Sequence, residues 1–291
     1  MATAPLSSNE HMEIELSTRL AAISRELKAD VLTFIGPLQT NIDDLLRRVV
    51  DIPNKKRDIA IILETNGGYI EVTERIVDLL RHHYKGEVSF LIPNFAMSAG
   101  TILALSGDHI YMDYYSILGP IDPQIDNRAG QTVPALGYLN KYNELVRKSQ
   151  RGKLSTAELA YFIEKFDPGE MDLFEQARDL TIDLLKKWLV RYKFKNWTKT
   201  KTRKRRVTSQ MREKRAEQIA RRLSDTRQWR SHGRGLSMAV LQNDLNLVVI
   251  DFGAEPKLNT CVRDYYRLLK DYQERRAHSI VFHVPGRHIG Y

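Results

Sequence analysis

The sequence predicts an α/β protein in which helices cover both faces of a largely parallel β-sheet. Short runs rich in β-branched residues, such as ADVLTFIG (residues 29–36) and IAIILET (59–65), indicate buried strands that end in glycine or in Asn-Gly-Gly. Amphipathic segments with apolar residues three and four positions apart separate these runs, as in YIEVTERIVDLLRHH (69–83), and indicate helices. Strands that alternate with helices of about 10 to 15 residues are typical of repeated βαβ units.

An uncharged stretch, FLIPNFAMSAGTILALSG (90–107), contains the next strand and the next helix. A run of this length approaches what a helix rising about 1.5 Å per residue needs to cross a bilayer. However, Pro93 interrupts it after the strand-like segment EVSFLIP, and Gly100 lies early in the remainder. Strands of a parallel sheet covered on both faces are apolar without contact with lipid. The sequence therefore predicts a buried strand followed by a helix, with no membrane span.

The second half of the chain is dominated by helical periodicity. LFEQARDLTIDLLKKWLVRY (173–192) is the clearest helix, and MREKRAEQIARRLSD (211–225) has a single apolar face. GLSMAVLQNDLNLVVIDF (235–252) predicts a helix followed by a strand, and NTCVRDYYRLLKDYQERRA (259–277) predicts a closing helix. We expect four regions: a leader or helix at 1–28, a core at 29–190, a basic helical insert at 191–227, and a segment that completes the core at 228–291.

The net charge of +9 is concentrated in one part of the chain. Between Lys186 and Arg234 there are 19 lysines and arginines and three acidic residues, so this segment carries +16 and the remainder −7. One interpretation is a solvated arm or helix face that packs on a neighbouring subunit. The other is a patch for nucleic acid or another acidic partner, with tryptophans available for stacking: Trp188, Trp197 and Trp229.

Cysteine content and the N-terminus bear on the cellular compartment. The single cysteine, Cys261, excludes an intrachain disulfide and suits a reducing environment. The first residues, MATAPLSSNEHMEIEL, lack the basic start and apolar stretch of a signal peptide, so we expect a frayed leader and a cytoplasmic protein. No cysteine and histidine cluster has the spacing of metal ligands, and we expect neither a metal nor a cofactor.

Two turns at predicted strand ends carry residues suited to acyl-transfer chemistry. Gly67 and Gly68 follow the strand IAIILET, and consecutive glycines let backbone N–H groups face outward, as an oxyanion hole requires. Ser98 precedes a helix, where the helix dipole and the N–H of Ala99 favour a developing negative charge. From these residues alone, an ordinary turn and an ordinary helix cap remain open as alternatives.

Longer stretches around these turns resemble a known family. Residues 29–81 look like the first half of the Clp protease fold, in which a Gly-Gly turn precedes the nucleophilic serine by about thirty residues. MSAGT (97–101) and LGPIDPQ (118–124) are most similar to the serine dehydrogenase proteinase family, a Clp-fold relative of signal peptide peptidase A. WRSHGRGLSMAVLQNDLNLVVID (229–251) is similar to the end of that fold. The resemblance implies a soluble serine peptidase that forms homo-oligomers. The basic insert makes this chain longer than a minimal Clp subunit.

The chain departs from the Clp family in its catalytic partners. The segment SILGPIDPQI, where that family carries its triad histidine, contains no histidine. Signal peptide peptidase relatives use a lysine as general base, which makes Lys141 the first candidate, and His232 is the alternative. Asp122 is a candidate for orienting either base, although it also suits a turn between two prolines.

Two other function classes remain open on the sequence. A crotonase-type acyl-CoA enzyme shares the fold and its paired oxyanion amides but has no need of Ser98. A catalytically inert Clp-fold protein, acting in assembly or nucleic-acid binding, would also fit the missing histidine. For the peptidase, we expect Ser98 to attack a peptide carbonyl while Gly67, Gly68 and Ala99 form the oxyanion hole.

Overall fold

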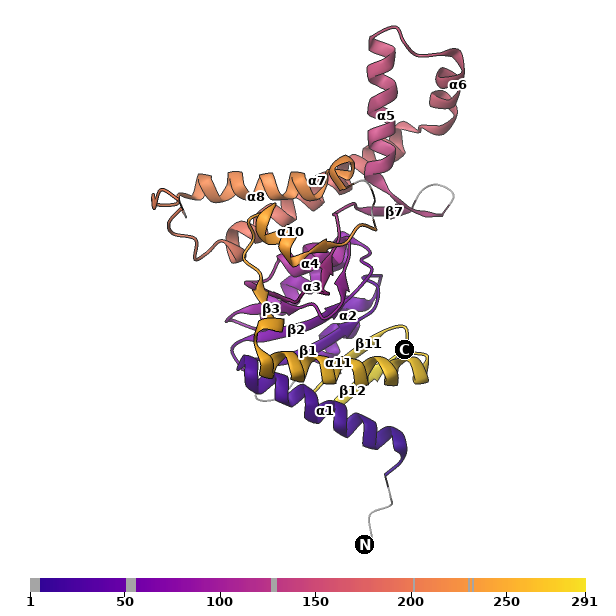
Figure 1. Cartoon of the computed structure of the whole chain (residues 1–291). Helices are drawn as coiled ribbons and strands as arrows, with labels where there is room; N and C mark the ends of the chain where they lie inside the picture. Colours follow the sequence, from indigo (N-terminus) through magenta and orange to yellow (C-terminus); the bar gives the residue numbers. More distant parts are fainter. Residues whose placement is uncertain (1–5, 51–55, 127–129, 201, 230, 232) are drawn as a thin grey trace.

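The computed structural model describes residues 6–50, 56–126, 130–200, 202–229, 231 and 233–291. Its centre is a sheet of seven strands in the order β10-β5-β3-β2-β1-β11-β12 (Figure 1). The neighbouring strands from β10 to β1 are parallel, and β11 and β12 continue the sheet antiparallel. The strands are β1 (Asp30–Ile35), β2 (Ile59–Glu64), β3 (Val88–Leu91), β5 (His109–Met112), β10 (Ile250–Asp251), β11 (Val281–Val284) and β12 (Arg287–Gly290).

Helices cover both faces of this sheet (Figure 1). Along β2, Ile59, Ile61 and Leu63 enter one hydrophobic cluster, and Ala60 and Ile62 enter the other, which explains why the strand is apolar throughout. The predicted α/β class with a largely parallel sheet is therefore confirmed. One face carries α1 (Ser8–Leu27) and α11 (Pro256–Arg276), and the other carries α2 (Ile42–Val50), α3 (Ile70–His83), α4 (Ala99–Leu105) and α7 (Pro168–Trp188).

A small second sheet has the order β4-β6-β9 and lies beside the start of α4. Its strands are β4 (Phe95–Ala96), β6 (Ile117–Leu118) and β9 (Leu236–Ser237). The uncharged stretch 90–107 thus holds the end of β3, then β4 and α4, as predicted for a buried strand followed by a helix. Within the part of the chain that the structure covers, no helix is both long and apolar enough to cross a bilayer.

A helical arm, which contains α5 (Ala135–Gln150) and α6 (Thr156–Lys165), projects from the core beside β7 (Gln124–Asp126) (Figure 1). A short hairpin of β7 and β8 (Thr132–Pro134) leads into α5, and α6 folds back beside α5. Aromatic rings hold the two helices together, since Tyr142 stacks on Phe162 with ring centroids 5.4 Å apart. The arm extends the molecule well beyond the sheet.

The basic segment packs on its own chain. α7 continues without a break into the π-helix η1 (Leu189–Lys193), so the expected boundary at 190 lies inside a helical segment. The following helix, α8 (Ser209–Leu223), buries the predicted apolar face in the main core. This apolar face packs against α7 of the same chain, so it is not the part of the basic segment that could contact a neighbouring subunit. The buried side chains are Ala216, Ile219, Ala220 and Leu223.

Tryptophans and arginines of the basic segment also have structural roles. Trp188 is 1% exposed and Trp229 is 4% exposed, so neither is available to stack on a nucleic-acid base. Arginines of α8 donate hydrogen bonds to backbone carbonyls of nearby loops: Arg212 to Trp197, Arg215 to Leu245, and Arg222 to Asp244. The segment is completed by α9 (Thr226–Trp229), α10 (Met238–Asn243) and the 3₁₀-helix η2 (Phe252–Ala254).

Both ends of the described chain differ from expectation. A leader or helix is expected over 1–28, with a frayed start, whereas residues from Ser8 onward form α1, which starts with a capping box between Ser7 and Glu10. The helix is ordered because its buried residues Leu16, Leu20 and Ile23 pack in the same cluster as α11. At the other end, the hairpin of β11 and β12 was not predicted.

Candidate active site

Ser98 occupies a strained turn between β4 and α4. Its φ of 51° and ψ of −119° are unusual for a residue with a side chain. Because β4 ends at Ala96 and α4 begins at Ala99, the chain passes from strand to helix within two residues. This is the local geometry of a nucleophile elbow, in which a sharp strand-to-helix turn presents a serine hydroxyl.

The Gly-Gly turn packs directly against Ser98. A Cβ atom placed on Gly67 would lie 2.8 Å from the Cβ of Ser98 and 2.7 Å from the carbonyl oxygen of Met97. A Cβ placed on Gly68 would lie 2.1 Å from the carbonyl oxygen of Leu38. Both glycines have positive φ, of 99° and 147°. Close approach and backbone conformation together explain why glycine stands at both positions.

Backbone hydrogen bonds fix this turn between two neighbouring loops. Leu38 donates its N–H to the carbonyl of Gly67 at 2.8 Å, and its own carbonyl accepts from the N–H of Tyr69 at 2.8 Å. On the other side, Met97 donates its N–H to the carbonyl of Thr65 at 2.9 Å. The ends of β1, β2 and β4 are thereby joined around the Gly-Gly turn.

The three predicted oxyanion donors are not equivalent. The N–H of Gly67 donates to the hydroxyl of Thr65 at 3.0 Å, so this N–H is already engaged, and the close contact of Gly67 with Ser98 makes room for the serine. By contrast, the N–H groups of Gly68 and Ala99 have no acceptor among the described residues. They belong to the two turns that meet at Ser98, and the latter N–H is at the positive end of α4.

The hydroxyl of Ser98 donates to the backbone carbonyl of Asp122 at 3.1 Å. Ser98 is also 1% exposed, so the loop that contains Asp122 covers it. A backbone carbonyl cannot accept the serine proton in a reaction, because it is too weak a base. This arrangement is therefore a closed one, from which the hydroxyl must turn away to meet a general base.

Asp122 connects this loop to the helix that carries Lys141. The carboxylate of Asp122 is buried and accepts a hydrogen bond from the N–H of Leu136 at 3.0 Å, in the first turn of α5. Lys141 lies farther along α5 with an exposed side chain, and its amine is ion-paired with Glu144 at 3.2 Å. The structure thus brings together Ser98, the glycines and Asp122, while the Lys141 amine is engaged elsewhere. His232 lies outside the described residues.

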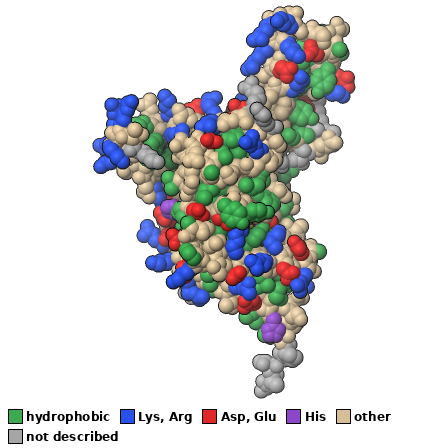
Figure 2. All heavy atoms as spheres, viewed as in Figure 1, with side chains coloured by type: hydrophobic (Ala, Val, Ile, Leu, Met, Phe, Trp, Pro, Cys, Tyr) green, Lys and Arg blue, Asp and Glu red, His purple; other side chains and the backbone are tan. Residues whose placement is uncertain are grey.

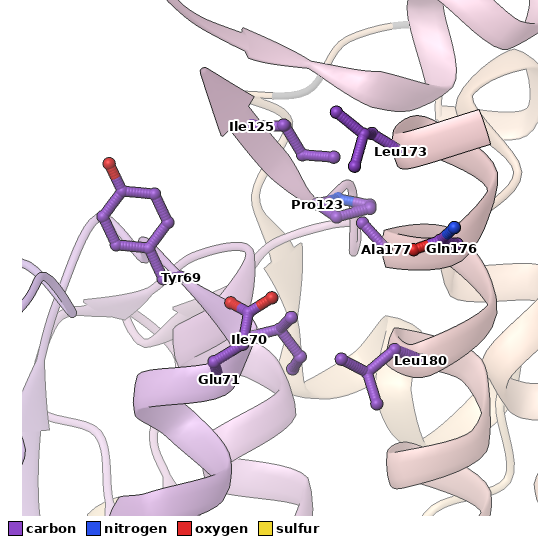
Figure 3. Close-up of a pocket in the computed structure, with 9 residues that line it drawn as sticks. All are labelled: Tyr69, Ile70, Glu71, Pro123, Ile125, Leu173, Gln176, Ala177 and Leu180. Carbon is purple, nitrogen blue, oxygen red and sulfur yellow. The ribbon is translucent and has the colours of Figure 1, made fainter. Parts of the chain in front are cut away.

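A pocket of about 550 Å³ opens beside the Gly-Gly turn and the Asp122 loop (Figure 3). Two of its lining residues are covalent neighbours of site residues, because Tyr69 follows Gly68 and Pro123 follows Asp122. The opposite wall is one face of α7. The volume lies in the range that ligand pockets occupy in proteins. The lining residues are Tyr69, Ile70, Glu71, Pro123, Ile125, Leu173, Gln176, Ala177 and Leu180.

Sequence reasoning missed residues that hold the turns in place. The hydroxyl oxygen of Thr101 lies 2.8 and 2.9 Å from the carbonyl oxygens of Ala96 and Gly119, which share its one proton, and it accepts from the N–H of Gly119 at 2.8 Å. It thereby ties α4 to the segment LGPIDPQ. Thr65 was also missed, although a threonine two residues before the glycine it binds is a local signal. The α7 wall of the pocket has no such signal, because it lies far away in sequence.

A buried carboxylate anchors the end of β2 just before the Gly-Gly turn. Glu64 accepts hydrogen bonds from the hydroxyl of Tyr266 and from the amine of Lys270, the latter at 2.9 Å. Burial, together with the charge of Glu64, raises the pKa of the Tyr266 phenol, so the phenol stays protonated and donates. Among the residues that the structure includes, no group of three or more His, Cys, Asp or Glu side chains has an arrangement that could hold a metal ion.

The fold and the serine turn define a Clp-like α/β protein, and comparison with known families agrees. The family described as ClpP-like SDH-type serine proteinases matches residues 27–205, which is more than half of the chain. The chain belongs to this family. The predicted resemblance to serine dehydrogenase proteinases is thereby confirmed.

Individual relatives were also found. An uncharacterised protein of Methanocaldococcus jannaschii is 30% identical over 185 residues, which cover 58% of this chain and 61% of that protein. A second one from the same organism is 37% identical over 83 residues, or 28% of each chain. The matches thus span about three fifths of the first relative and about a quarter of the second.

Two solved structures are similar at a lower level. A mutant of the 1510-N membrane-bound stomatin-specific protease in complex with a substrate peptide has a TM-score of 0.44 and 16% identity, covering 89% of this chain and 84% of that one. Another mutant of that protease has a TM-score of 0.30 and 21% identity, covering 50% and 73%. At these identities and scores, neither structure bears on the activity of this chain.

Proposed function

We propose that this protein is a serine endopeptidase whose nucleophile is Ser98. The observation that carries the proposal is the strained Ser98 turn packed on Gly67. In the two turns that meet there, the N–H groups of Gly68 and Ala99 have no acceptor among the residues that the structure describes. Membership of the ClpP-like SDH-type serine proteinase family supports the same activity. A nucleophile and preorganised donors are what acyl transfer requires.

In the proposed reaction, the Ser98 oxygen attacks the carbonyl carbon of a peptide bond and its proton passes to a general base. The N–H groups of Gly68 and Ala99 donate to the oxyanion of the tetrahedral intermediate. Collapse of this intermediate breaks the C–N bond, and the leaving amine takes the proton from the base. Water then hydrolyses the acyl-enzyme by the same steps, with the base accepting a proton from the water.

Lys141 and His232 remain the two proposed bases, and Asp122 the residue proposed to orient the base. Asp122 is well placed to position α5, since its carboxylate holds the first turn of the helix that carries Lys141. For Lys141 to act, its amine must leave Glu144 and approach Ser98 in a drier environment. Substrate must also displace the Asp122 carbonyl from the Ser98 hydroxyl.

Hydrolysis of a mixed peptide library, followed by mass spectrometry, tests the activity. Wild-type protein should release fragments from internal peptide bonds, and Ser98→Ala should release none. Ser149→Ala, on an exposed position of α5, is the matched control and should cleave as wild type. Cleavage by Ser98→Ala at the wild-type rate would refute the proposal.

The same variants separate the two other function classes. A crotonase-type enzyme would bind an acyl-CoA and keep its activity in Ser98→Ala, because that chemistry does not use the serine. A catalytically inert protein would cleave no peptide and react with no serine probe, yet would keep its binding partners. We further infer that the protein is cytoplasmic, because its single cysteine suits a reducing compartment, and that it acts as a homo-oligomer, as the family resemblance implies. Cell fractionation tests the location, and light scattering tests the oligomeric state.

We also propose that the basic segment binds an acidic partner. A hairpin (residues 198–200 and 202–207, the basic hairpin) precedes α8, and Lys199 pairs with Arg206 across it. Its exposed cations have no carboxylate partner among the described residues: Lys199, Arg203, Lys204, Arg205 and Arg206. Lysines and arginines cluster at this end of the molecule in Figure 2, at the left. A two-stranded ribbon rich in arginine suits contact with nucleic-acid phosphates.

A further inference from the structure

The pocket beside the Gly-Gly turn and the Asp122 loop combines apolar walls with a single charged group. Six of its nine lining residues are apolar, and two of the others, Tyr69 and Gln176, are polar but uncharged at neutral pH. Glu71 is the one charged residue among the nine. An apolar pocket with one carboxylate matches a ligand that has a hydrocarbon stem and a cationic end.

Glu71 is available to bind such a ligand. It lies in the first turn of α3, and Figure 3 shows its carboxylate directed away from the helix into the space between Tyr69 and Leu180. It has no ion pair or side-chain hydrogen bond with any residue that the structure describes. A carboxylate in the first turn of a helix is also stabilised by the helix dipole. That effect explains an acidic residue at this position, but it does not explain why the carboxylate faces an apolar pocket. The position of Glu71 in the pocket is therefore the informative feature.

We propose that this pocket binds a lysine or arginine side chain of the peptide substrate. Leu173 and Leu180 on α7 face Pro123 and Ile70 across the pocket, and these side chains would contact the methylene stem. The carboxylate of Glu71 would accept the charge-assisted hydrogen bond from the ammonium or guanidinium group. This inference rests on the proposed peptidase function and assigns its substrate preference.

The position of the pocket relative to Ser98 supports this assignment. Tyr69 and Pro123 are directly bonded to the two segments that contact Ser98, the Gly-Gly turn and the Asp122 loop. A peptide bond held at Ser98 would place a neighbouring side chain at the pocket mouth. The volume of about 550 Å³ leaves room for the longest side chains. The positive charge of the substrate side chain would thus be recognised next to the peptide bond that is cleaved.

Binding to the inert Ser98→Ala protein tests the inference without requiring catalysis. The probes are fluorescein-labelled octapeptides with blocked ends, in which lysine, norleucine or glutamate occupies each position in turn, and affinity is measured by fluorescence anisotropy. At one position, the peptide with lysine should bind about tenfold more tightly than the peptide with norleucine, and the peptide with glutamate should bind most weakly. Raising the salt concentration should reduce the difference in affinity between the lysine and norleucine peptides, because salt screens the ion pair.

Added substitutions identify the residue responsible. Ser98→Ala with Glu71→Gln should bind lysine and norleucine peptides equally, whereas Glu74→Gln, one turn farther along α3, should keep the preference. Leu173→Ser, at an exposed part of the wall, should weaken both peptides. Equal affinities in the parent, a preference that survives Glu71→Gln, or no peptide binding would overturn the inference. Loss of peptidase activity in the Ser98 protein itself affects none of these readouts.

Discussion

Gly67 and Ser98 are in such close contact that a Cβ atom on Gly67 would lie 2.8 Å from the Cβ of Ser98. The two residues belong to different turns, one after β2 and one after β4. Real Cβ contacts are essentially never this short, so any larger residue at 67 must push the serine turn away. The position of the proposed nucleophile therefore depends on a glycine 31 residues earlier in the sequence.

Gly67→Ala should abolish peptidase activity and destabilise the protein by about 1–3 kcal/mol, because alanine is strained at positive φ and collides with Ser98. Activity assays and urea unfolding measure the two effects. Gly137→Ala is the matched control, since a Cβ there contacts nothing within 4 Å and the site is inside a helix. This variant should keep activity and gain about 0.5–1 kcal/mol. Wild-type activity in Gly67→Ala would contradict the described packing.

Separate Lys141→Ala and His232→Ala variants should identify the general base. Loss of the base should reduce the acylation rate by about 10²–10⁴-fold, whereas loss of the other residue should leave it near wild type. Stopped-flow measurement of acyl-enzyme formation reports this step directly. Glu144→Gln is a control for Lys141, because it removes the ion-pair partner and keeps the amine. Full activity in both alanine variants would exclude both assignments.

The protein should lose stability in mild acid through His283. Its ring nitrogens bond to the hydroxyls of Tyr265 and Ser17, at 2.8 and 3.3 Å, and burial lowers its pKa from 6.5 to about 3. The unfolded chain therefore binds more protons between these two values, and stability falls as the pH decreases below about 6.5. The loss is up to about 1.4 kcal/mol per pH unit from this group.

Urea unfolding at several pH values measures this dependence. Nearby, the pKa values of His278 and His288 are lowered mainly by burial, so both add to the loss, and Glu13 acts in the opposite direction on them. His283→Gln should flatten the profile between pH 6.5 and 4, and His82→Gln, at an exposed position, should not. If the free energy of unfolding of His283→Gln depends on pH as steeply as that of wild type, groups other than His283 cause the loss of stability in acid.

Neutralising the basic hairpin should weaken binding of the chain to nucleic acid. A variant with Arg203, Lys204, Arg205 and Arg206 changed to glutamine removes four positive charges. Its affinity for a labelled DNA duplex should fall, and the dependence of binding on salt should become less steep. Arg147→Gln and Lys153→Gln, exposed cations on the helical arm, serve as controls. Equal binding by all proteins would exclude the hairpin as the contact.

Local pattern predicted much of the fold and of the candidate site. The alternation of apolar strands with amphipathic helices gave the parallel sheet, and the apolar face of α8 was visible in its spacing. The two glycines were found because they directly follow a recognisable strand, and Ser98 was found because it precedes a recognisable helix. These features depend on residues close together in the sequence, so the spacing of apolar residues is enough to predict them.

Features that depend on distant contacts were missed or misassigned. The helix α1 is ordered by packing on α11, which lies more than 200 residues later, so its polar start resembled a frayed leader. The hydrogen bond from the Gly67 N–H to the Thr65 hydroxyl depends on the rotamer of Thr65, which the sequence pattern does not specify. The pocket wall on α7 and the carbonyl of Asp122 at Ser98 both arise from tertiary packing.

Covalent labelling with a fluorophosphonate tests the central claim most directly, because the reagent reacts only with an activated serine. Wild-type protein should be labelled on the peptide that contains Ser98. Ser98→Ala should not be labelled, while its thermal unfolding stays cooperative. Mass spectrometry of the digested protein locates the adduct. Equal labelling of wild type and Ser98→Ala would contradict Ser98 as the nucleophile.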